Sequence, residues 1–292
     1  MKNSELILNP DGSVYHLNLK PEHLAQNVIL VGDQDRVDRV SKYFDVIIFK
    51  TQKREFKTHT GVYKNTPISV VSTGIGVDNI DIVLNELDAL VNINLQNRTI
   101  KEKLTTLNIV RVGTSGALQV DIPVDSIVVS KFGLGLDNML WAYQDIASCT
   151  NHDLSKAFVS HAKWNSNKGI PIAVASSETL FDAFATKDTF EGITATAPGF
   201  YGSQGRVLRL MVDDVSLNEK LNSFDYQGNK ITNFEMETSA IYGLSKLLGH
   251  KALSLNVIVA NRFQGTFSQN PYNSIDRLIQ YTLEKFASMH NK

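Results

Sequence analysis

Short, continuous apolar runs alternate with helical spacing along this chain, and this alternation limits the folds that it can adopt. The run at 28–31 is apolar throughout and is ended by Gly32-Asp33, and Val37, Val40 and Phe44 then follow with helical spacing. A strand that is apolar at consecutive positions is buried on both faces, so helices must cover both sides of its sheet. The pattern therefore predicts an α/β fold.

The same alternation continues toward the C-terminus. We expect further strands at 68–73, 109–112, 127–129, 170–175 and 252–260. We expect helices at 35–44, 80–91, 238–248, with Gly249 as the residue that ends it, and 275–286. Glycine and polar residues cluster where the strands end, which is where sheets of this class bind their ligands.

Length and composition indicate one soluble enzyme-sized domain. No Pro, Gly or Ser tract divides the 292 residues, so we expect a single domain over 1–292, with 1–14 as an N-terminal extension. The 29 basic and 30 acidic residues nearly cancel, which argues against nucleic acid or an anionic membrane as a partner. The single Cys149 allows no intrachain disulfide, and together with the absence of a signal peptide or membrane span it predicts a cytoplasmic protein.

Several common catalytic motifs are absent. The chain has no phosphate-binding P-loop, no G-x-S-x-G nucleophile elbow and no H-E-x-x-H zinc motif, and its seven His residues lack metal-ligand spacing. Gly74-x-Gly76 lacks the third glycine of a dinucleotide fingerprint. We therefore expect neither a catalytic metal nor a nucleotide cofactor.

Arg111 is the most informative single residue, because it lies inside an apolar strand. An unpaired guanidinium there is costly, so Arg111 must meet either a buried carboxylate or an anionic ligand. We expect the following Gly113-Thr114-Ser115-Gly116 to form a turn whose N–H groups and hydroxyls suit a phosphate. A carboxylate elsewhere in the chain stays open as the alternative partner.

Three other segments combine chemistry with a simpler alternative. Two carboxylates flank Met236 in 235–237 and suit the hydroxyls of a sugar, although acidic residues at a helix start are also favourable to its dipole. Gln204 and Arg206 follow an aromatic pair and can read the edge of a planar base, but the segment can equally be a plain loop. Around Gly32 and Arg36, a tight turn and a solvated helix residue are the alternative.

The order of these segments resembles the nucleoside phosphorylases of the uridine phosphorylase type, from about Tyr15 to the last helix. The residues that carry the resemblance are Val31-Gly32-Asp33-x-Asp35-Arg36-Val37, Arg54-Glu55-Phe56, Ser72-Thr73-Gly74-Ile75-Gly76, Arg111-Val112-Gly113-Thr114-Ser115-Gly116, Phe200-Tyr201-x-x-Gln204-x-Arg206 and Phe234-Glu235-Met236-Glu237. The resemblance implies a three-layer α/β/α sandwich with a central mixed, partly barrel-like sheet. It also implies phosphorolysis, in which inorganic phosphate attacks C1′ of the ribose while uracil departs.

The resemblance also assigns roles to individual residues. The phosphate pocket would consist of Gly32, Arg36, Arg111 and Thr114, with Arg54 from a neighbouring subunit. The ribose site would consist of Glu235, Met236 and Glu237, with His16 from across a dimer interface, and the uracil site of Phe200, Gln204 and Arg206. Of these, Arg111, Thr114, Arg206 and Glu237 would be catalytic. The functional unit would be a homo-oligomer, at least a dimer, and a dimer and a hexamer built as a trimer of dimers both stay open.

Asn261 and Asn79 separate this chain from parts of the family. Purine phosphorylases and adenine-releasing nucleosidases have an Asp after the penultimate strand, where this chain has Asn261, which is no general acid. Relatives with an intersubunit monovalent cation hold it by a Glu like Glu55, the carbonyl at Ile75 and a small residue where this chain has Asn79, so the cation stays open. No role follows for 183–198. We expect phosphate as co-substrate and no cofactor, with a purine phosphorylase, a methylthioadenosine-type nucleosidase or a non-catalytic nucleoside-binding protein as alternatives.

Overall fold

A computed structural model describes residues 1–290 of the chain. Its strands are β1 (Asn27–Val31), β2 (Val46–Lys53), β3 (Phe56–Tyr63), β4 (Thr66–Ser72), β5 (Ile93–Asn94), β6 (Thr99–Ile100), β7 (Asn108–Ala117), β8 (Ile127–Gly135), β9 (Ile172–Ala175), β10 (Phe190–Thr196), β11 (Asp225–Tyr226), β12 (Asn229–Glu235), β13 (Lys251–Asn261) and β14 (Thr266–Phe267). Its α-helices are α1 (Gln34–Ser41), α2 (Val77–Asn92), α3 (Ile146–Cys149), α4 (His152–Ala162), α5 (Glu178–Phe184), α6 (Leu217–Ser223), α7 (Thr238–Leu247) and α8 (Pro271–His290).

Most strands belong to one twelve-stranded mixed sheet, part of which closes on itself. The path of hydrogen-bonded neighbours runs β11-β12-β10-β8-β13-β7-β1-β4-β3-β2. An additional antiparallel pairing joins β12 to β7, so that β7, β13, β8, β10 and β12 form a ring. The expected α/β fold with a mixed, partly barrel-like sheet is confirmed.

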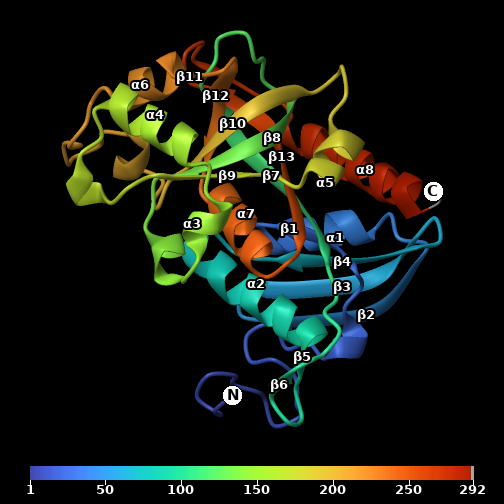
Figure 1. Cartoon of the computed structure of the whole chain (residues 1–292). Helices are drawn as coiled ribbons and strands as arrows, with labels where there is room; N and C mark the ends of the chain where they lie inside the picture. Colours follow the sequence, from blue (N-terminus) through green and yellow to red (C-terminus); the bar gives the residue numbers. More distant parts are fainter. Residues whose placement is uncertain (291–292) are drawn as a thin grey trace.

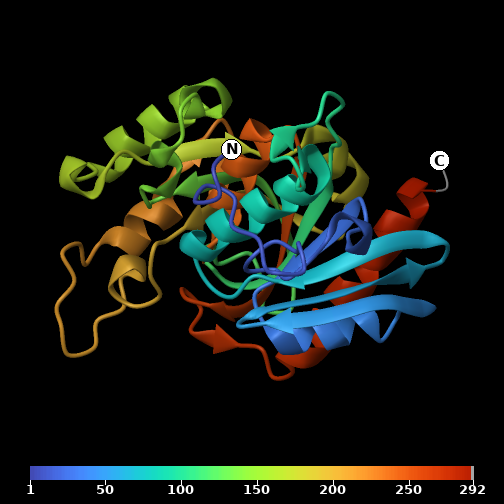
Figure 2. The ribbon, with the colours of Figure 1, turned by 90° about the horizontal axis from the view of Figure 1, so that it is seen from below.

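Helices cover both faces of the sheet, as the apolar runs require (Figure 1), and Figure 2 shows the same ribbon from below. In β1, Val28 and Leu30 pack in one core cluster with α2 and α7, whereas Ile29 and Val31 pack in another with α1, α5 and α8. A third cluster lies between α4, α6 and the strands β8, β9, β10 and β12. Burial on both faces is the physical reason why β1 reads as a continuous apolar run.

Most elements expected from the sequence are present, with one correction that matters for the site. The expected strand at 109–112 continues to Ala117, so Gly113-Thr114-Ser115-Gly116 is extended strand and the expected phosphate-binding turn is wrong. β13 pairs with β7 along this stretch, from Lys251↔Asn108 to Asn261↔Ala117, and its ladder keeps the backbone extended. The expected helix at 35–44 ends at Ser41, and Gly249 follows α7 with a φ of 78°, as expected.

The structure also locates segments for which the sequence indicated nothing. The stretch 183–198 contains β10, which lies between β8 and β12 in the ring. The extension 1–14 is tied to the body through side chains: Arg98 donates to the carbonyl of Leu6 and Lys53 to the side chain of Asn9. Within 1–290, no helix is both long enough and apolar enough to cross a membrane.

A glycine in β8 sets how closely α7 approaches the ring. A Cβ built on Gly133 would lie 2.9 Å from the Cα of Ser239, in the first turn of α7. Backbone atoms cannot yield as a flexible side chain does, so any residue larger than glycine pushes the helix start away from the sheet.

We predict that Gly133→Ala lowers the free energy of unfolding by about 1–3 kcal/mol through this overpacking. Urea unfolding with an unchanged m-value measures the loss. Lys230→Ala, at an exposed position of β12, is the control and should have little effect. A Gly133→Ala protein as stable as the wild type would show that α7 can shift without cost.

Candidate active site

A single cavity of about 1390 Å³ collects residues from segments that are far apart in the sequence. It lies where β1, β4, β7, β12 and β13 end or pass, and beside the turn at 200–206. Ten of the residues expected at the site line it: Gly32, Arg36, Arg111, Thr114, Phe200, Gln204, Arg206, Glu235, Met236 and Glu237. His16 and Arg54 do not line it.

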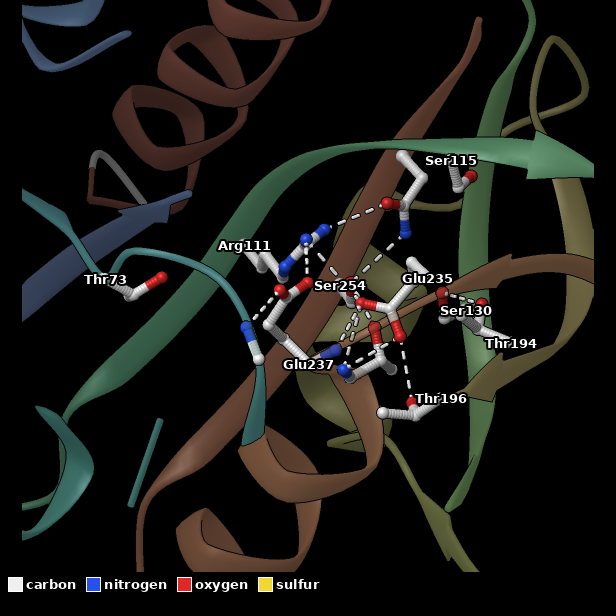
Figure 3. A network of polar contacts seen from close by, with 12 residues as sticks. Thr73, Arg111, Ser115, Ser130, Thr194, Thr196, Glu235, Glu237 and Ser254 are labelled. Atoms are coloured by element: carbon white, nitrogen blue, oxygen red, sulfur yellow. Dashed lines mark hydrogen bonds and ion pairs between the residues drawn. The ribbon is translucent and has the colours of Figure 1, made fainter. Parts of the chain in front are cut away.

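Buried polar side chains from every strand of the ring form two hydrogen-bonded groups beside this cavity. One surrounds Arg111 (Figure 3), and the other joins Ser115, Asn233, Thr194 and Ser130. The direct links are Ser115–Asn233 at 2.9 Å, Asn233–Thr194 at 2.8 Å, Thr194–Ser130 at 2.5 Å, Thr196–Glu235 at 2.8 Å and Arg111–Asn256 at 2.9 Å. Each buried polar group thereby has a partner, which removes most of the cost of its burial.

Arg111 is the centre of the group that contains Glu235 and Glu237. One of its terminal nitrogens, Nη2, donates to Oε2 of Glu237 and lies 3.6 Å from Oε2 of Glu235, and Nη1 donates to Asn256. Burial disfavours its charge, but the two carboxylates outweigh burial and raise the pKa of Arg111. Arg111 therefore has the carboxylate partner that the sequence left open, and its guanidinium also borders the cavity.

Glu235 holds the beginning of α7 in place. Its carboxylate accepts hydrogen bonds from the N–H groups of Glu237 and Thr238, each at 3.0 Å, and from the hydroxyl of Thr196. Burial in the first place, and Glu237 in addition, raise the pKa of Glu235 to about 7, although Arg111 and Thr238 act in the opposite direction. Glu235 thus positions the next carboxylate, since Glu237 is the residue that precedes α7.

Glu237 connects three segments through its two oxygens. Oε2 accepts from Arg111, and Oε1 accepts from the backbone N–H of Gly76 at 2.8 Å. Gly74 and Gly76 have φ values of 73° and 96°, a conformation that only glycine adopts without strain, and it forms the turn between β4 and α2. The glycines noted in the sequence therefore bring a backbone donor to Glu237.

A second guanidinium lies beside Arg111 at the same part of the cavity. Arg36, on α1, donates to the carbonyl of Val112 at 3.1 Å. Burial, and then the neighbouring positive charge of Arg111, lower the pKa of Arg36 to about 10. Arg36 is thus no solvated helix residue. Two cations held close together by the fold, next to Gly32 and Thr114, favour the binding of an anion.

Gln204 lies between two arginines in another part of the cavity. Its Oε1 accepts from Arg206 at 2.6 Å and from Arg262 at 2.5 Å, which leaves the amide Nε2 as its donor. The guanidinium of Arg206 lies over the ring of Phe200, 3.8 Å from its centroid. Burial lowers the pKa of Arg262 to about 10, with Arg206 as a further cause.

Arg262 is a site residue that the sequence reasoning missed. Arg262 directly follows Asn261, which drew notice only because an amide cannot act as a general acid. The pattern that could have identified Arg262 is a basic residue directly after a long apolar strand. Asn261 itself is buried and has a structural role: Nδ2 donates to the carbonyls of Gln119 and Ile122, and Oδ1 accepts from Phe263 and Gln264.

His16 and Arg54 lie away from the cavity lining. Nδ1 of His16 is 2.7 Å from Oε1 of Glu86, whose carboxylate also accepts the N–H groups of residues 16 and 17. A carboxylate only accepts, so Nδ1 carries the hydrogen and Nε2 is free to contact another molecule. Arg54 is exposed and has a φ of 55°.

The residues of the uncertain cation site are neighbours. The amide nitrogen of Asn79 donates to the carbonyl of Ile75 at 3.5 Å. A Cβ built on Gly74 would lie 2.4 Å from that amide nitrogen and 3.1 Å from Cγ of Glu55. Asn79 thus already provides a hydrogen-bond donor for the carbonyl that a cation would need.

Comparisons with known proteins match most of the chain. A family model described as "Phosphorylase superfamily" matches residues 26–284. A solved nucleoside phosphorylase of Trypanosoma brucei, described as showing uridine phosphorylase activity, is 31% identical with a TM-score of 0.87, over 97% of this chain and 99% of that one. The uridine phosphorylase of Thermococcus kodakarensis is 29% identical over 265 residues, 89% of this chain and 81% of its own length. A DeoD-type purine nucleoside phosphorylase of Bacillus subtilis is 28% identical over 244 residues, 82% and 84% of the two chains.

We predict that Arg111→Met lowers the free energy of unfolding by about 3–5 kcal/mol near neutral pH, because it leaves two buried carboxylates without their cation. A buried carboxyl group with a raised pKa binds its proton more tightly in the folded protein than in the unfolded one. Its contribution to stability is therefore complete below the unfolded-state pKa and is lost as the pH rises.

The deficit of Arg111→Met should accordingly shrink as the pH is lowered from 8 toward 5, as measured by urea unfolding at each pH. Lys42→Met, which removes a surface ion pair with Asp276, is the control and should show little effect. If the loss of unfolding free energy were the same at every pH, the variant would not contain buried carboxylates that lack a cation.

Proposed function

The chain belongs to the phosphorylase superfamily, and on that basis we propose that it is a uridine phosphorylase, which uses inorganic phosphate to convert uridine to uracil and ribose 1-phosphate. The observation that carries the proposal is the arrangement of one cavity: two arginines at an anion-binding part, a carboxylate beside it, and an amide held by two further arginines at another part.

Arg36, Arg111, Gly32 and Thr114 would bind phosphate. The two guanidinium groups are fixed before the substrate arrives, so they orient the nucleophile without a cost of rearrangement during the reaction. Their positive charge also allows a dianion to enter a largely buried site. Phosphate is the co-substrate here and no cofactor is required.

Glu237 and Met236 would bind the ribose. The carboxylate of Glu237 is an acceptor for the 2′- and 3′-hydroxyls, and the thioether of Met236, which lines the cavity, packs against the sugar. Glu235 acts through Glu237, because its oxygens hold the start of α7. Positive charge that develops at C1′ is favoured by phosphate on one side and by these carboxylates nearby.

Gln204, Arg206 and Phe200 would bind uracil, and Arg262 would assist them. Uracil leaves with negative charge on its oxygens and ring nitrogen, which guanidinium groups and an amide donor stabilise as it forms. Arg262 holds the amide of Gln204 so that Nε2 is the donor. No acid is needed for protonation of a purine nitrogen, which is consistent with the structural role of Asn261.

His16 and Arg54 would complete the site of a neighbouring subunit. Neither lines the cavity of its own chain, yet the free Nε2 of His16 and the exposed guanidinium of Arg54 are both available for contacts outside it. We therefore propose a homo-oligomer of at least two subunits. We further propose that it works without the intersubunit cation, because Asn79 donates to the carbonyl of Ile75, and that it acts in the cytoplasm.

The function is tested by following uracil release from uridine by ultraviolet absorbance, with and without phosphate. We expect release that requires phosphate and is faster for uridine than for inosine. Equal cleavage in phosphate-free buffer would identify a nucleosidase, and faster turnover of inosine a purine phosphorylase. If no nucleoside were turned over, the chain would be a non-catalytic nucleoside-binding protein. Arg206→Ala should raise the KM for uridine without changing the KM for phosphate.

The shared site is tested by mixing subunits of two impaired variants, Arg54→Ala and Arg206→Ala, carrying different tags. In a mixed pair, one site receives Arg206 from one subunit and Arg54 from the other, so activity should return. The control is a mixture of Arg206→Ala with Gln204→Ala, whose defects both lie in the subunit's own cavity. Recovery in neither mixture would show that each chain builds its site alone.

A further inference from the structure

A buried amide in β13 contacts the phosphate-site arginine and has no role in the function described above. Asn256 is fully buried between the apolar neighbours Leu255 and Val257. Its Oδ1 accepts from Nη1 of Arg111 at 2.9 Å. Because a guanidinium has donors only, the atom of Asn256 that faces it must be the oxygen.

The orientation of this amide is set from its other side. Nδ2 of Asn256 donates to Oγ of Ser254 at 3.3 Å, and the same Oγ accepts from the hydroxyl of Thr238, the first residue of α7. Figure 3 shows Ser254 below Arg111 in this chain of contacts. The amide is thus held between the start of α7 and the guanidinium, so its oxygen stays directed at Arg111.

Gly113 provides the space for this contact. Gly113 lies opposite Asn256 in the ladder between β7 and β13. A Cβ built on Gly113 would lie 1.5 Å from Nη1 of Arg111 and 2.7 Å from Oδ1 of Asn256. Gly113 has no positive φ, so its role is to leave room for the guanidinium rather than to form a turn.

The charges around Arg111 explain why an amide suits this position. Nη2 is already held by Glu237, with Glu235 close by. A third carboxylate at the position of Asn256 would cancel the positive charge that phosphate needs. An apolar residue there would leave the two carboxylates as the only partners of Arg111, and they would draw its guanidinium away from the cavity. A neutral acceptor holds Nη1 and leaves the charge of Arg111 uncompensated on that side.

We propose that Asn256 is a positioning residue, which holds Arg111 where phosphate and Glu237 share its guanidinium. The proposal rests on the function proposed above and adds a residue that acts on phosphate through Arg111 without touching any substrate. The proposal predicts different effects on the two substrates: loss of Asn256 raises the KM for phosphate and leaves the KM for uridine largely unchanged.

The test is Asn256→Leu, which keeps the approximate volume and removes the acceptor. We expect the KM for phosphate to rise about ten-fold, as for the loss of one hydrogen bond to a charged group, and the KM for uridine at saturating phosphate to change by less than about three-fold. The control is Asn92→Leu. Asn92 is also a buried amide, but it bonds to the backbone of Thr105 and the side chain of Asp88 rather than to Arg111.

If an amide has only a structural role, its loss lowers the thermal unfolding midpoint and changes neither KM. This is the result expected for Asn92→Leu. An unchanged KM for phosphate in Asn256→Leu, or an equal rise of both KM values, would overturn the proposal. Should this variant not fold, Asn256→Ala removes the acceptor with a smaller side chain and adds no charge.

For Asn256→Ala we expect a smaller thermal stabilisation by inorganic phosphate alone than for the wild type, and an equal one would contradict the proposal. This readout needs no turnover. If phosphate stabilised the wild-type protein but uridine were not cleaved, only the proposed function would be overturned. The effect of Asn256 on phosphate binding could still be measured by thermal unfolding.

Discussion

The buried contacts of Arg111 are the interaction on which the remainder of the site depends. A guanidinium inside a sheet is tolerated only when several acceptors surround it, and here they come from the start of α7 and from β13. The same carboxylates accept the first N–H groups of α7 and the N–H of Gly76. One buried cation therefore ties the ring of strands, the helix α7 and the turn before α2 to a single geometry.

This arrangement also explains how a chain with almost no net charge can bind a dianion. Most surface charges cancel, but Arg36 and Arg111 lie together where burial weakens the screening of their charge by water. The carboxylate of Glu237, which stabilises Arg111, is also the one that would contact the sugar. Phosphate at Arg111 and the sugar at Glu237 would then lie side by side, each with its own contacts.

The elements that the sequence predicted are those with a strong local signal. Runs such as that of β1 are apolar because both faces are covered, and α2 and α8 show a regular apolar stripe. β10 and β12 have no such run, because the side chains that they bury include Thr194, Thr196 and Asn233. These bond to one another, to neighbouring strands and to the start of α7. Local pattern reading has no access to partners that distant segments provide.

The sequence by itself determined the fold class, the order of the motifs and the residue types that meet at the cavity, because hydrophobic periodicity and the cost of a buried charge are local properties. Only the tertiary structure decided that Gly113 lies in a strand, that Arg111 is paired with Glu237 and held by Asn256, and that Arg262 orients Gln204. These contacts join residues that are 58 to 145 positions apart, and which donor meets which acceptor follows from strand pairing and helix packing in space.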